Sequence, residues 1–347
     1  MKKFNIGIIG LGMGSTVLEI NKLQTSSLQV RGICDKDLNK AAELQKEYGV
    51  DYITEDYREL VKDKAIDIVA VFSPDHLHAE HCSAALEKSK HVICTKPLVT
   101  SLKDAKKLVK LVEEKKVKFL VGQTMRYEPQ FTAIKKMYDD NDLGDIIVAE
   151  AHYVHDMRPV FKATPWRLKV PQDLMYGGVC HPVDVLRWFL GDVEEVFAYG
   201  NKGNITPEYS IKGNFLLNLK FKTGPIARIM GVYDIVHPPM PMMGLSILGS
   251  KGSVIGSFSD KLGGEVKTVL DKFEIKAENK MVYSPETEGA YGHGVTVIRY
   301  LKHFEECLKK DNVPVPDVRE GAKSIAVCSA AWESINSGKP VKVFNEF

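Results

Sequence analysis

The sequence predicts an α/β protein of two domains, in which a parallel-sheet domain precedes a domain with a largely antiparallel sheet. Up to about residue 122, short apolar runs alternate with amphipathic helical segments, which is typical of βαβ units with right-handed crossovers. Beyond this point, strand-like segments follow one another with turn signals between them, such as Lys-Thr-Gly-Pro at residues 222–225. At 347 residues the chain is also long for one hydrophobic core. We therefore expect domains at residues 1–122 and 123–347.

The composition argues against several classes of function. Charged residues make up 27% of the chain and the net charge is +2, so charge gives no reason to expect binding to nucleic acid or to a membrane surface. The six cysteines include no Cys-x-x-Cys pair, and we expect reduced thiols in a cytoplasmic protein. Glycines interrupt the apolar start of the chain. We therefore expect no signal peptide, and no later stretch is long enough to span a bilayer.

A glycine-rich turn opens the first domain. The apolar run Phe4–Ile9 is typical of a buried strand and breaks at Gly10, Gly12 and Gly14. In a dinucleotide site, Gly10 permits a tight turn, Gly12 lets the backbone approach a pyrophosphate, and a helix that begins near Gly14 points its N–H groups at the phosphate charge. Ser15 takes the place of the third glycine of this motif and is small enough for close helix packing.

Asp35 stands at the end of the second expected strand. There its carboxylate would accept hydrogen bonds from the hydroxyls of an adenosine ribose. The same carboxylate would repel a 2′-phosphate, so we expect NAD as the cofactor. Lys36 follows directly and could bind such a phosphate, which leaves NADP open. The alternative interpretation of the whole stretch is a tight strand-to-helix turn that binds no ligand.

The rest of the first domain continues the alternation of strands and helices. Helices are expected at residues 37–48, 57–61, 79–87 and 102–115, and strands at residues 29–34, 51–53, 66–72, 91–94 and 118–121. Ligands of open α/β sheets bind beyond the carboxyl ends of the strands. We therefore expect the residues that follow these strands, 73–78, 95–97 and 123–126, to line one crevice with the glycine turn and Asp35.

The second domain has a different pattern. Strands are expected at residues 146–153, 193–199, 214–221, 227–232, 245–249 and 253–257, and helices at residues 128–138, 183–190, 296–310 and 320–337. Partial alternation of polar and apolar residues is typical of a sheet with one covered face. The methionine-rich segment 237–243 is expected to pack on a neighbouring surface rather than to contact a ligand.

Two side chains are candidates for chemistry. Lys96 follows an apolar strand and precedes Pro97, where it could relay a proton or donate a hydrogen bond to a substrate oxygen. If a helix begins near Pro182, His181 lies at its N-terminus, a position that keeps an imidazole neutral and fit to act as a base. The alternative interpretations are that Lys96 is an ordinary surface lysine and that His181 caps a helix. No metal-ligand spacing is found, so we expect no metal.

The surroundings of His181 add two features. The two glycines Gly177 and Gly178 stand just before it and indicate a close approach of the backbone to another group. Asp184 follows one helical turn later on the same side.

Taken together, the motifs resemble the glucose-fructose oxidoreductase, inositol dehydrogenase and rhizopine-catabolism family, Gfo/Idh/MocA. The matching residues span nearly the whole chain: the glycine turn with Asp35, Pro74 and His78, Lys96 and Pro97, Arg126 and Pro129, Trp166 and Arg167, and the run from Gly177 to Asp184. The resemblance implies a Rossmann domain followed by an α/β domain with an open, mostly antiparallel sheet. It also implies homodimers or homotetramers built through that sheet, and a C-terminal segment able to pack back on the first domain.

The resemblance assigns roles to particular residues. The family's lysine and histidine match Lys96 and His181, which we expect to be catalytic. The expected cofactor contacts are Gly10, Gly12, Met13, Gly14, Asp35, Ser73, Pro74, His78, Thr95, Lys96, Arg126, Trp166 and Arg167. The expected substrate contacts are Lys96, Tyr153, Tyr176, His181 and Asp184.

The chain departs from the family pattern at two carboxylates. Thr95 replaces the glutamate before the lysine, and Gly177 replaces the aspartate four residues before the histidine. Tyr176, Asp173 or Asp184 must then substitute for the second of these, or the mechanism differs.

The leading hypothesis is an NAD(P)-dependent dehydrogenase that transfers a hydride between nicotinamide and a hydroxyl-bearing carbon of a sugar, cyclitol or related polyol. Two alternatives stay open. One is a glycoside-cleaving enzyme that oxidises its substrate transiently with a retained cofactor, and the other is a non-catalytic dinucleotide-binding regulatory protein. The specificity surface is expected to come from residues 152–169 and 233–243.

Overall fold

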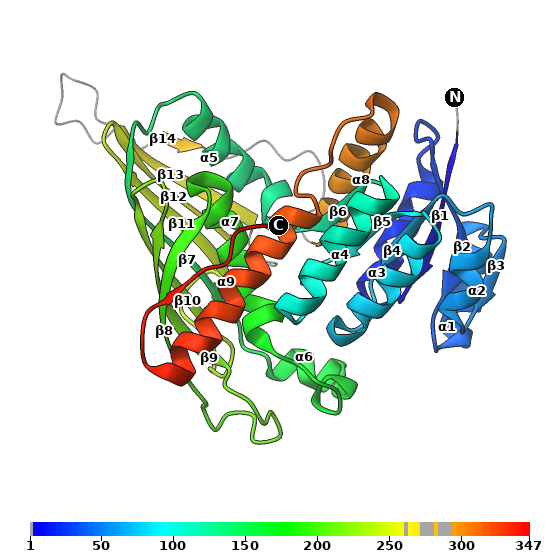
Figure 1. Ribbon diagram of the computed structural model, residues 1–347, viewed down its shortest axis with the longest axis horizontal. Coiled ribbons are helices and arrows are strands. Elements are labelled where there is room, and N and C mark those ends of the chain that lie inside the picture. The colour runs from blue at the N-terminus through cyan, green and yellow to red at the C-terminus, as the bar shows by residue number, and fades with distance from the viewer. Residues whose placement is uncertain (1–2, 260–262, 271–280, 284–292) are drawn as a thin grey trace. The chain divides into compact units, whose positions relative to one another are not determined.

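The structure is a computed structural model that describes residues 3–259, 263–270, 281–283 and 293–347 (Figure 1). The chain divides into two compact units. The first unit runs to Thr124 and takes up the chain again in a later segment that ends at Ala322. The second unit begins at Met125 and includes residues Lys323–Glu346 near the C-terminus.

A six-stranded parallel sheet forms the core of the first unit, in the order β3-β2-β1-β4-β5-β6. This is the strand order of a doubly wound dinucleotide-binding fold. The strands are β1 (Phe4–Ile9), β2 (Leu28–Cys34), β3 (Tyr52–Thr54), β4 (Ile68–Val71), β5 (His91–Thr95) and β6 (Phe119–Gly122). The helices are η1 (Met13–Lys22), α1 (Leu38–Tyr48), α2 (Tyr57–Lys62), η2 (Asp75–Leu77), α3 (His78–Glu87), α4 (Leu102–Lys115) and α8 (His293–Lys310). The predicted parallel sheet is confirmed.

Local sequence signals set the limits of several of these helices. Asp37 and Ser101 accept hydrogen bonds from the backbone N–H groups of the first turns of α1 and α4. Gly49 ends α1 in the left-handed conformation, with φ of 65°.

The second unit is built on a nine-stranded sheet in the order β14-β13-β12-β11-β7-β10-β9-β8-β15. Among the described strands of this nine-stranded sheet, only β7 and β10 pair in parallel. The predicted, mostly antiparallel sheet is therefore confirmed. The strands are β7 (Ile146–Val154), β8 (Val193–Asn201), β9 (Asn214–Phe221), β10 (Ile226–Val232), β11 (Met243–Gly249), β12 (Gly252–Ser259), β13 (Gly263–Leu270), β14 (Met281–Tyr283) and β15 (Val341–Lys342). Sequence reasoning missed β13, β14 and β15.

The helical elements of the second unit include one π turn. They are η3 (Thr124–Tyr127), α5 (Pro129–Asp139), α6 (Arg158–Ala163), η4 (Pro165–Leu168), the π turn η5 (Met175–Val179), α7 (Cys180–Leu190) and α9 (Val318–Ser337). The helix α6 was not predicted. Two of these elements, η3 and α9, cross the boundary between the units.

One face of the nine-stranded sheet is covered by α5, α7 and α9 (Figure 1). Side chains of β9 alternate strictly between buried and exposed, as expected for a sheet covered on one side. On the covered face, the Trp332 ring of α9 meets Phe215 edge-on with ring centroids 5.5 Å apart. The backbone N–H of Ala198 donates to the hydroxyl of Ser334 at 3.0 Å, which also fixes α9 on this face.

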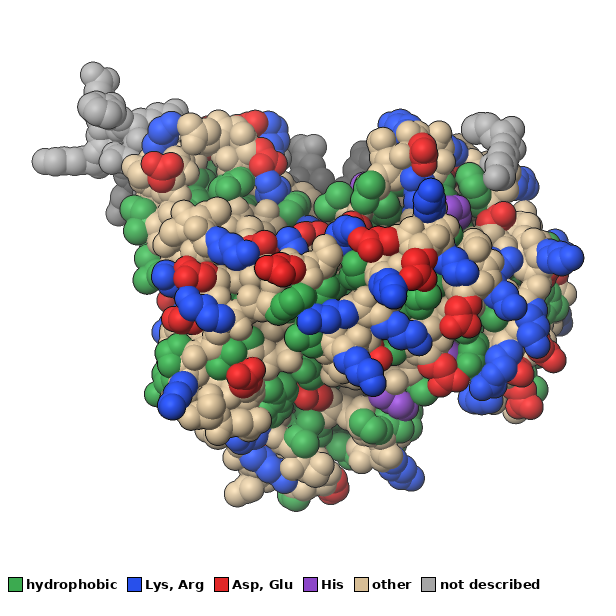
Figure 2. Space-filling model, in the orientation of Figure 1, with side chains coloured by type: hydrophobic (Ala, Val, Ile, Leu, Met, Phe, Trp, Pro, Cys, Tyr) green, Lys and Arg blue, Asp and Glu red, His purple; other side chains and the backbone are tan. Residues whose placement is uncertain are grey.

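The exterior matches the near-neutral composition. Figure 2 shows acidic and basic side chains intermixed over the face that it displays, without a broad patch of one sign. None of the described helices is long and apolar enough to cross a membrane.

Candidate functional site

The three glycines of the first turn have three different surroundings. Gly10 has a φ of 94°, and a Cβ there would lie 2.6 Å from the carbonyl oxygen of Phe72. At Gly14 a Cβ would lie 2.9 Å from the Cβ of Phe72 and 3.1 Å from Ile8. At Gly12 a Cβ would meet no described atom within 4 Å. The turn therefore needs Gly10, the packing needs Gly14, and Gly12 leaves the backbone open to a ligand.

The expectation that Ser15 provides close helix packing is wrong. Its hydroxyl donates to the carbonyl of Gly12 at 3.0 Å in an exposed position, and Gly14 makes the close contact instead. The reason is local geometry: η1 is a 3₁₀ helix that begins at Met13, so its tighter winding changes which residue faces the sheet. Met13 itself is 43% exposed at this turn.

Asp35 lies beside the glycine turn, as predicted. Its carboxylate accepts hydrogen bonds from the backbone N–H of Leu11 at 2.6 Å and of Asp37 at 2.9 Å. A carboxylate has about four acceptor positions, so ribose hydroxyls can still bind to it. Lys36 donates instead to the carbonyl of Glu55 at 3.1 Å. The residues at this turn therefore fit a dinucleotide.

His78 ties together the loops that follow β4 and β5. Its side chain is 0% exposed, with Nδ1 2.7 Å from the carbonyl oxygen of Pro97 and Nε2 2.8 Å from that of Ser73. Both ring nitrogens of His78 are thus occupied by backbone groups, and the expected contact of His78 with the cofactor stays a prediction. Its role is to hold the turn that carries Lys96, where the Lys96–Pro97 peptide bond is cis.

His81, which was not predicted, supports the same loops. Its Nδ1 lies 2.8 Å from the hydroxyl of Ser73, and its ring packs on Tyr57 with centroids 4.3 Å apart. Burial lowers the pKa of His81 to about 4, and the neighbouring imidazoles of His78 and His76 act in the same direction. His81 is therefore a neutral hydrogen-bond partner of Ser73. Pro74 and Thr95, at the ends of these two strands, are partly buried.

His181 lies within a helix and not at its start. The helix α7 begins at Cys180 and continues directly from the π turn η5, which begins at Met175. The predicted N-terminus near Pro182 is therefore wrong, and its effect on the imidazole does not apply. The His181 side chain is 1% exposed, and its ring meets that of Tyr153 edge-on, with centroids 5.5 Å apart.

One of the two glycines before His181, Gly178, makes room for a side chain. A Cβ at Gly178 would lie 2.4 Å from both Cζ and the hydroxyl of Tyr233. Tyr233 follows β10 and also meets Tyr153 edge-on, with centroids 5.2 Å apart. Burial raises the pKa of Tyr233 well above its ordinary value, so its hydroxyl stays protonated. The sequence analysis included Tyr233 in the expected specificity surface, residues 233–243, and Gly178 was the signal of its close approach.

Asp184 and Arg126 form a buried ion pair with each other. The Nε and Nη2 atoms of Arg126 donate to the carboxylate of Asp184 at 2.7 and 2.8 Å, and the two side chains are 4% and 1% exposed. The two charges are thus paired with each other, and the expected contacts of Arg126 with the cofactor and of Asp184 with the substrate stay predictions. The ion pair thereby holds α7, which carries Asp184, against Arg126 of η3.

The other substitutes for the missing carboxylate are also occupied. Asp173 accepts a hydrogen bond from the indole of Trp332 at 2.8 Å. Tyr176 interacts with Ser329 of α9, and burial raises the pKa of the Tyr176 hydroxyl. The expectation that Tyr176, Asp173 or Asp184 substitutes for the missing carboxylate stays a prediction.

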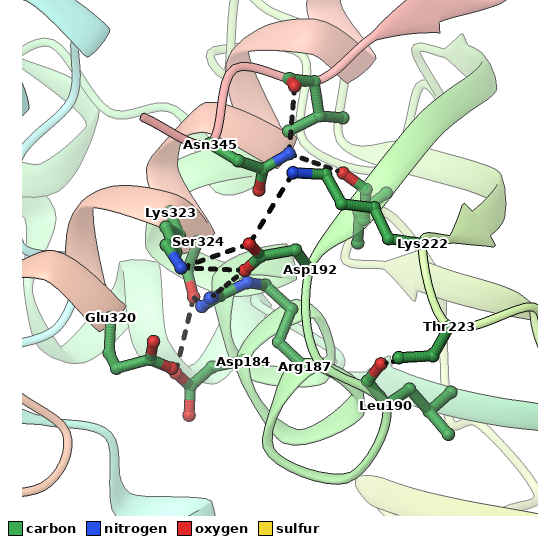
Figure 3. Close-up of polar contacts among 12 residues, drawn as sticks. Asp184, Arg187, Leu190, Asp192, Lys222, Thr223, Glu320, Lys323, Ser324 and Asn345 are labelled. Atoms are coloured by element: carbon green, nitrogen blue, oxygen red, sulfur yellow. Dashed lines mark hydrogen bonds and ion pairs between the residues drawn. The ribbon is translucent and has the colours of Figure 1, made fainter. Parts of the chain in front are cut away.

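A polar network anchors α7 to α9 (Figure 3). Ser324 bridges the two charges of α7: it accepts from Arg187 at 3.1 Å and donates to Asp184 at 3.3 Å. Asp192 accepts from Lys323 at 2.9 Å and lies 3.5 Å from Arg187. Burial favours the neutral form of Asp192, but Lys323 and its cationic neighbours outweigh burial and lower the pKa of Asp192. The helix that carries His181 is thus held by charged groups along its length.

Trp166 and Arg167 lie in η4 and form a pair of their own. Trp166 is 40% exposed, and the guanidinium of Arg167 stacks over its ring at 4.7 Å from the centroid. Arg167 also donates to Gln172 at 2.9 Å. Among the described residues, no group of three or more His, Cys, Asp and Glu side chains could hold a metal ion.

Comparison with known families identifies the class of protein. Residues 4–123 match the model described as an oxidoreductase family with an NAD-binding Rossmann fold, and residues 135–343 match the model of the C-terminal alpha/beta domain of the same oxidoreductase family. The chain therefore belongs to the Gfo/Idh/MocA family and is an NAD-binding oxidoreductase, which confirms the prediction from the motifs.

Individual relatives show which kinds of oxidoreductase the chain is similar to. The levoglucosan dehydrogenase of Pseudarthrobacter phenanthrenivorans is 28% identical over 383 residues, covering 96% of each chain. The inositol 2-dehydrogenase of Rubrobacter xylanophilus is 25% identical, covering 99% of this chain and 94% of the relative. A solved levoglucosan dehydrogenase in complex with NADH and L-sorbose shares the fold at 20% identity, with a TM-score of 0.88 over 100% of both chains.

Proposed function

We propose that this protein is an NAD-dependent dehydrogenase that oxidises a secondary hydroxyl group of a sugar, cyclitol or related polyol. The observation that carries the proposal is the open backbone at Gly12 beside the carboxylate of Asp35, in a chain that keeps Lys96 and His181. The relatives named as levoglucosan and inositol dehydrogenases support the substrate class. The carboxylate of Asp35 favours NAD over NADP.

Each of these residues would have a separate role in cofactor binding or in the reaction. Gly12 and the N–H groups at the start of η1 receive the pyrophosphate, and Asp35 accepts the ribose hydroxyls. Bound NAD supplies a hydride acceptor for the carbinol carbon. Lys96 donates a hydrogen bond to the substrate oxygen, and His181 takes the hydroxyl proton as general base. Tyr153 packs on the edge of the His181 ring and restricts its orientation.

Substitution of Lys96 tests the proposal. Removal of a group that holds and relays the proton should lower turnover by roughly 10²- to 10⁴-fold in Lys96→Met, with unchanged thermal unfolding. Lys103→Met is the matched control, because Lys103 is an exposed lysine of α4. The readout is NAD reduction over a panel of sugars and cyclitols. If Lys96→Met keeps turnover within about threefold of the unmodified enzyme, the assigned role is wrong.

We also propose that the enzyme is a homodimer or homotetramer joined through the open face of the nine-stranded sheet. Large apolar side chains on this face are exposed: Tyr199, Leu216, Ile226, Leu248 and Ile255. Exposed apolar groups gathered on one face are typical of an interface. Sedimentation of the double variant Leu216→Lys, Ile226→Lys should show a smaller assembly than the unmodified chain. An unmodified chain that sediments as a monomer would contradict the proposal.

A further inference from the structure

A cavity of about 800 Å³ opens in the second unit at the carboxyl end of β7. It is lined by two segments that are far apart in the sequence: Val154, His155, Asp156, Arg158, Pro159 and Lys162 on one side, and His237, Pro238, Met240 and Met242 on the other. The methionine-rich segment 237–243, which was expected to pack on a neighbouring surface, thus lines a cavity. Backbone hydrogen bonds join the two sides, since the N–H of Val154 donates to the carbonyl of Met242 at 2.8 Å.

One aromatic ring separates this cavity from the candidate base. The ring of His155 stacks on Tyr153, with centroids 5.9 Å apart and an interplanar angle of 20°. The Tyr153 ring also makes an edge contact with His181. A polyol that places one hydroxyl at His181 therefore has a second recognition region within a short distance.

Asp156 organises the polar side of the cavity. It accepts two hydrogen bonds from Arg158, at 2.9 and 2.6 Å, and lies 3.4 Å from the backbone N–H of His237. These hydrogen bonds, led by that from Arg158, lower the pKa of Asp156. His237 adopts a φ of 47°, an uncommon backbone conformation for a non-glycine residue. The carboxylate thus fixes both walls of the cavity at once.

The remaining donors favour an anion. Arg158 has five N–H donors and the two bonds to Asp156 occupy two of them. Lys162 has no hydrogen bond or ion pair with any residue that the structure describes. Counting Arg158 and Lys162 as positive and Asp156 as negative, the lining carries a formal charge of +1, and His155 and His237 also line the cavity.

We propose that this cavity binds an anionic group of the substrate, a carboxylate or a phosphate, so that the preferred substrate is an acidic polyol. The identity of the site as a substrate site rests on the proposed dehydrogenase function, whereas anion binding at the cavity does not. Lys162 supplies the unpaired charge, and Arg158 supplies hydrogen-bond donors that Asp156 holds in place.

Calorimetric titration with matched compounds tests the proposal. The compounds are D-glucitol, D-gluconate and D-glucitol 6-phosphate, together with methyl glucoside, D-glucuronate and D-glucose 6-phosphate as a ring-shaped set. We expect one or both anions of a set to bind about two- to fivefold more tightly than the neutral compound, as an exposed lysine allows, and the preference to shrink with added salt. Within each set, the anion that binds more tightly shows whether the cavity prefers a carboxylate or a phosphate.

Charge reversal supplies the control. Lys162→Glu should abolish the preference for anions, and Lys103→Glu, which changes the net charge equally on an exposed face of α4, should leave it intact. If neither anion binds more tightly than its neutral counterpart in either set, or if Lys162→Glu keeps the preference, the proposal is overturned. Turnover separates the two claims: anion preference without NAD reduction contradicts the dehydrogenase function alone, and equal oxidation of glucitol and gluconate contradicts the acidic substrate alone.

Discussion

Gly12 and Gly14 are two residues apart but have opposite surroundings. The side chain of an alanine at Gly14 would collide with Phe72, whereas at Gly12 it would project into open space. The sequence motif predicted that the three glycines have separate roles. It could not predict which residue packs on the sheet, because that depends on the 3₁₀ winding of η1, which the spacing of residues does not reveal.

These surroundings give opposite expectations for two substitutions. Gly12→Ala should leave thermal unfolding unchanged and weaken NAD binding by about tenfold or more, because the methyl group occupies the path of the pyrophosphate. Gly14→Ala should lower the free energy of unfolding by about 1–3 kcal/mol through overpacking. Titration with NAD and urea unfolding of both variants measure these effects. Unchanged NAD affinity in Gly12→Ala would rule out a pyrophosphate at this turn.

His81 should make stability depend on pH. Its pKa in the folded protein is about 4, below the unfolded value of about 6.5. Between these values the unfolded chain binds the proton and the folded one does not, so this contribution to stability is present above pH 6.5 and is lost as the pH falls towards 4. Urea unfolding at pH 7 and pH 5 should show a loss of about 2 kcal/mol from this group. The variant His81→Gln should lack that part of the loss; an equal loss in both proteins would contradict the assignment.

At the scale of elements, α7 and the π turn η5 decide where His181 lies. The sequence predicted a helix at residues 183–190, and its end at Leu190 is confirmed. The π turn was not predictable, because Tyr233, which packs against Gly178, is 55 positions further along the chain. For the same reason the sequence could show that Asp184 shares a helix face with His181 but not that Arg126 neutralises it.

Removing one partner of the buried ion pair between Arg126 and Asp184 should destabilise the protein strongly, whereas replacing both partners by apolar residues should destabilise it little. Asp184→Leu leaves a buried guanidinium without its counter-charge and should lower the free energy of unfolding by about 3–5 kcal/mol. Adding Arg126→Met removes the buried guanidinium as well and should restore most of that loss. Urea unfolding of the two single variants and the double variant measures the coupling. Additive losses in the double variant would show that the two charges do not depend on each other.

At the scale of the whole molecule, regular patterns proved predictable and long-range contacts did not. Apolar runs and their spacing predicted the parallel sheet and the mostly antiparallel sheet, and the resemblance of the motifs predicted the family. The segments expected to form the specificity surface do line the cavity in the second unit, but its organisation by Asp156 joins residues about 80 positions apart. Side-chain contacts of this kind depend on sheet register, which the sequence pattern does not specify.

Deuterium transfer tests the central claim most directly. Polyols and glycosides that carry deuterium at a carbinol carbon are incubated separately with the enzyme and NAD, and the label is located by mass spectrometry. The proposed function predicts one deuterium in the reduced nicotinamide for each ketone formed. Release of an aglycone with no accumulation of reduced cofactor would favour the glycoside-cleaving alternative, and the absence of transfer from every labelled sugar and cyclitol would favour a regulatory protein. Either result would contradict the assignment as a dehydrogenase.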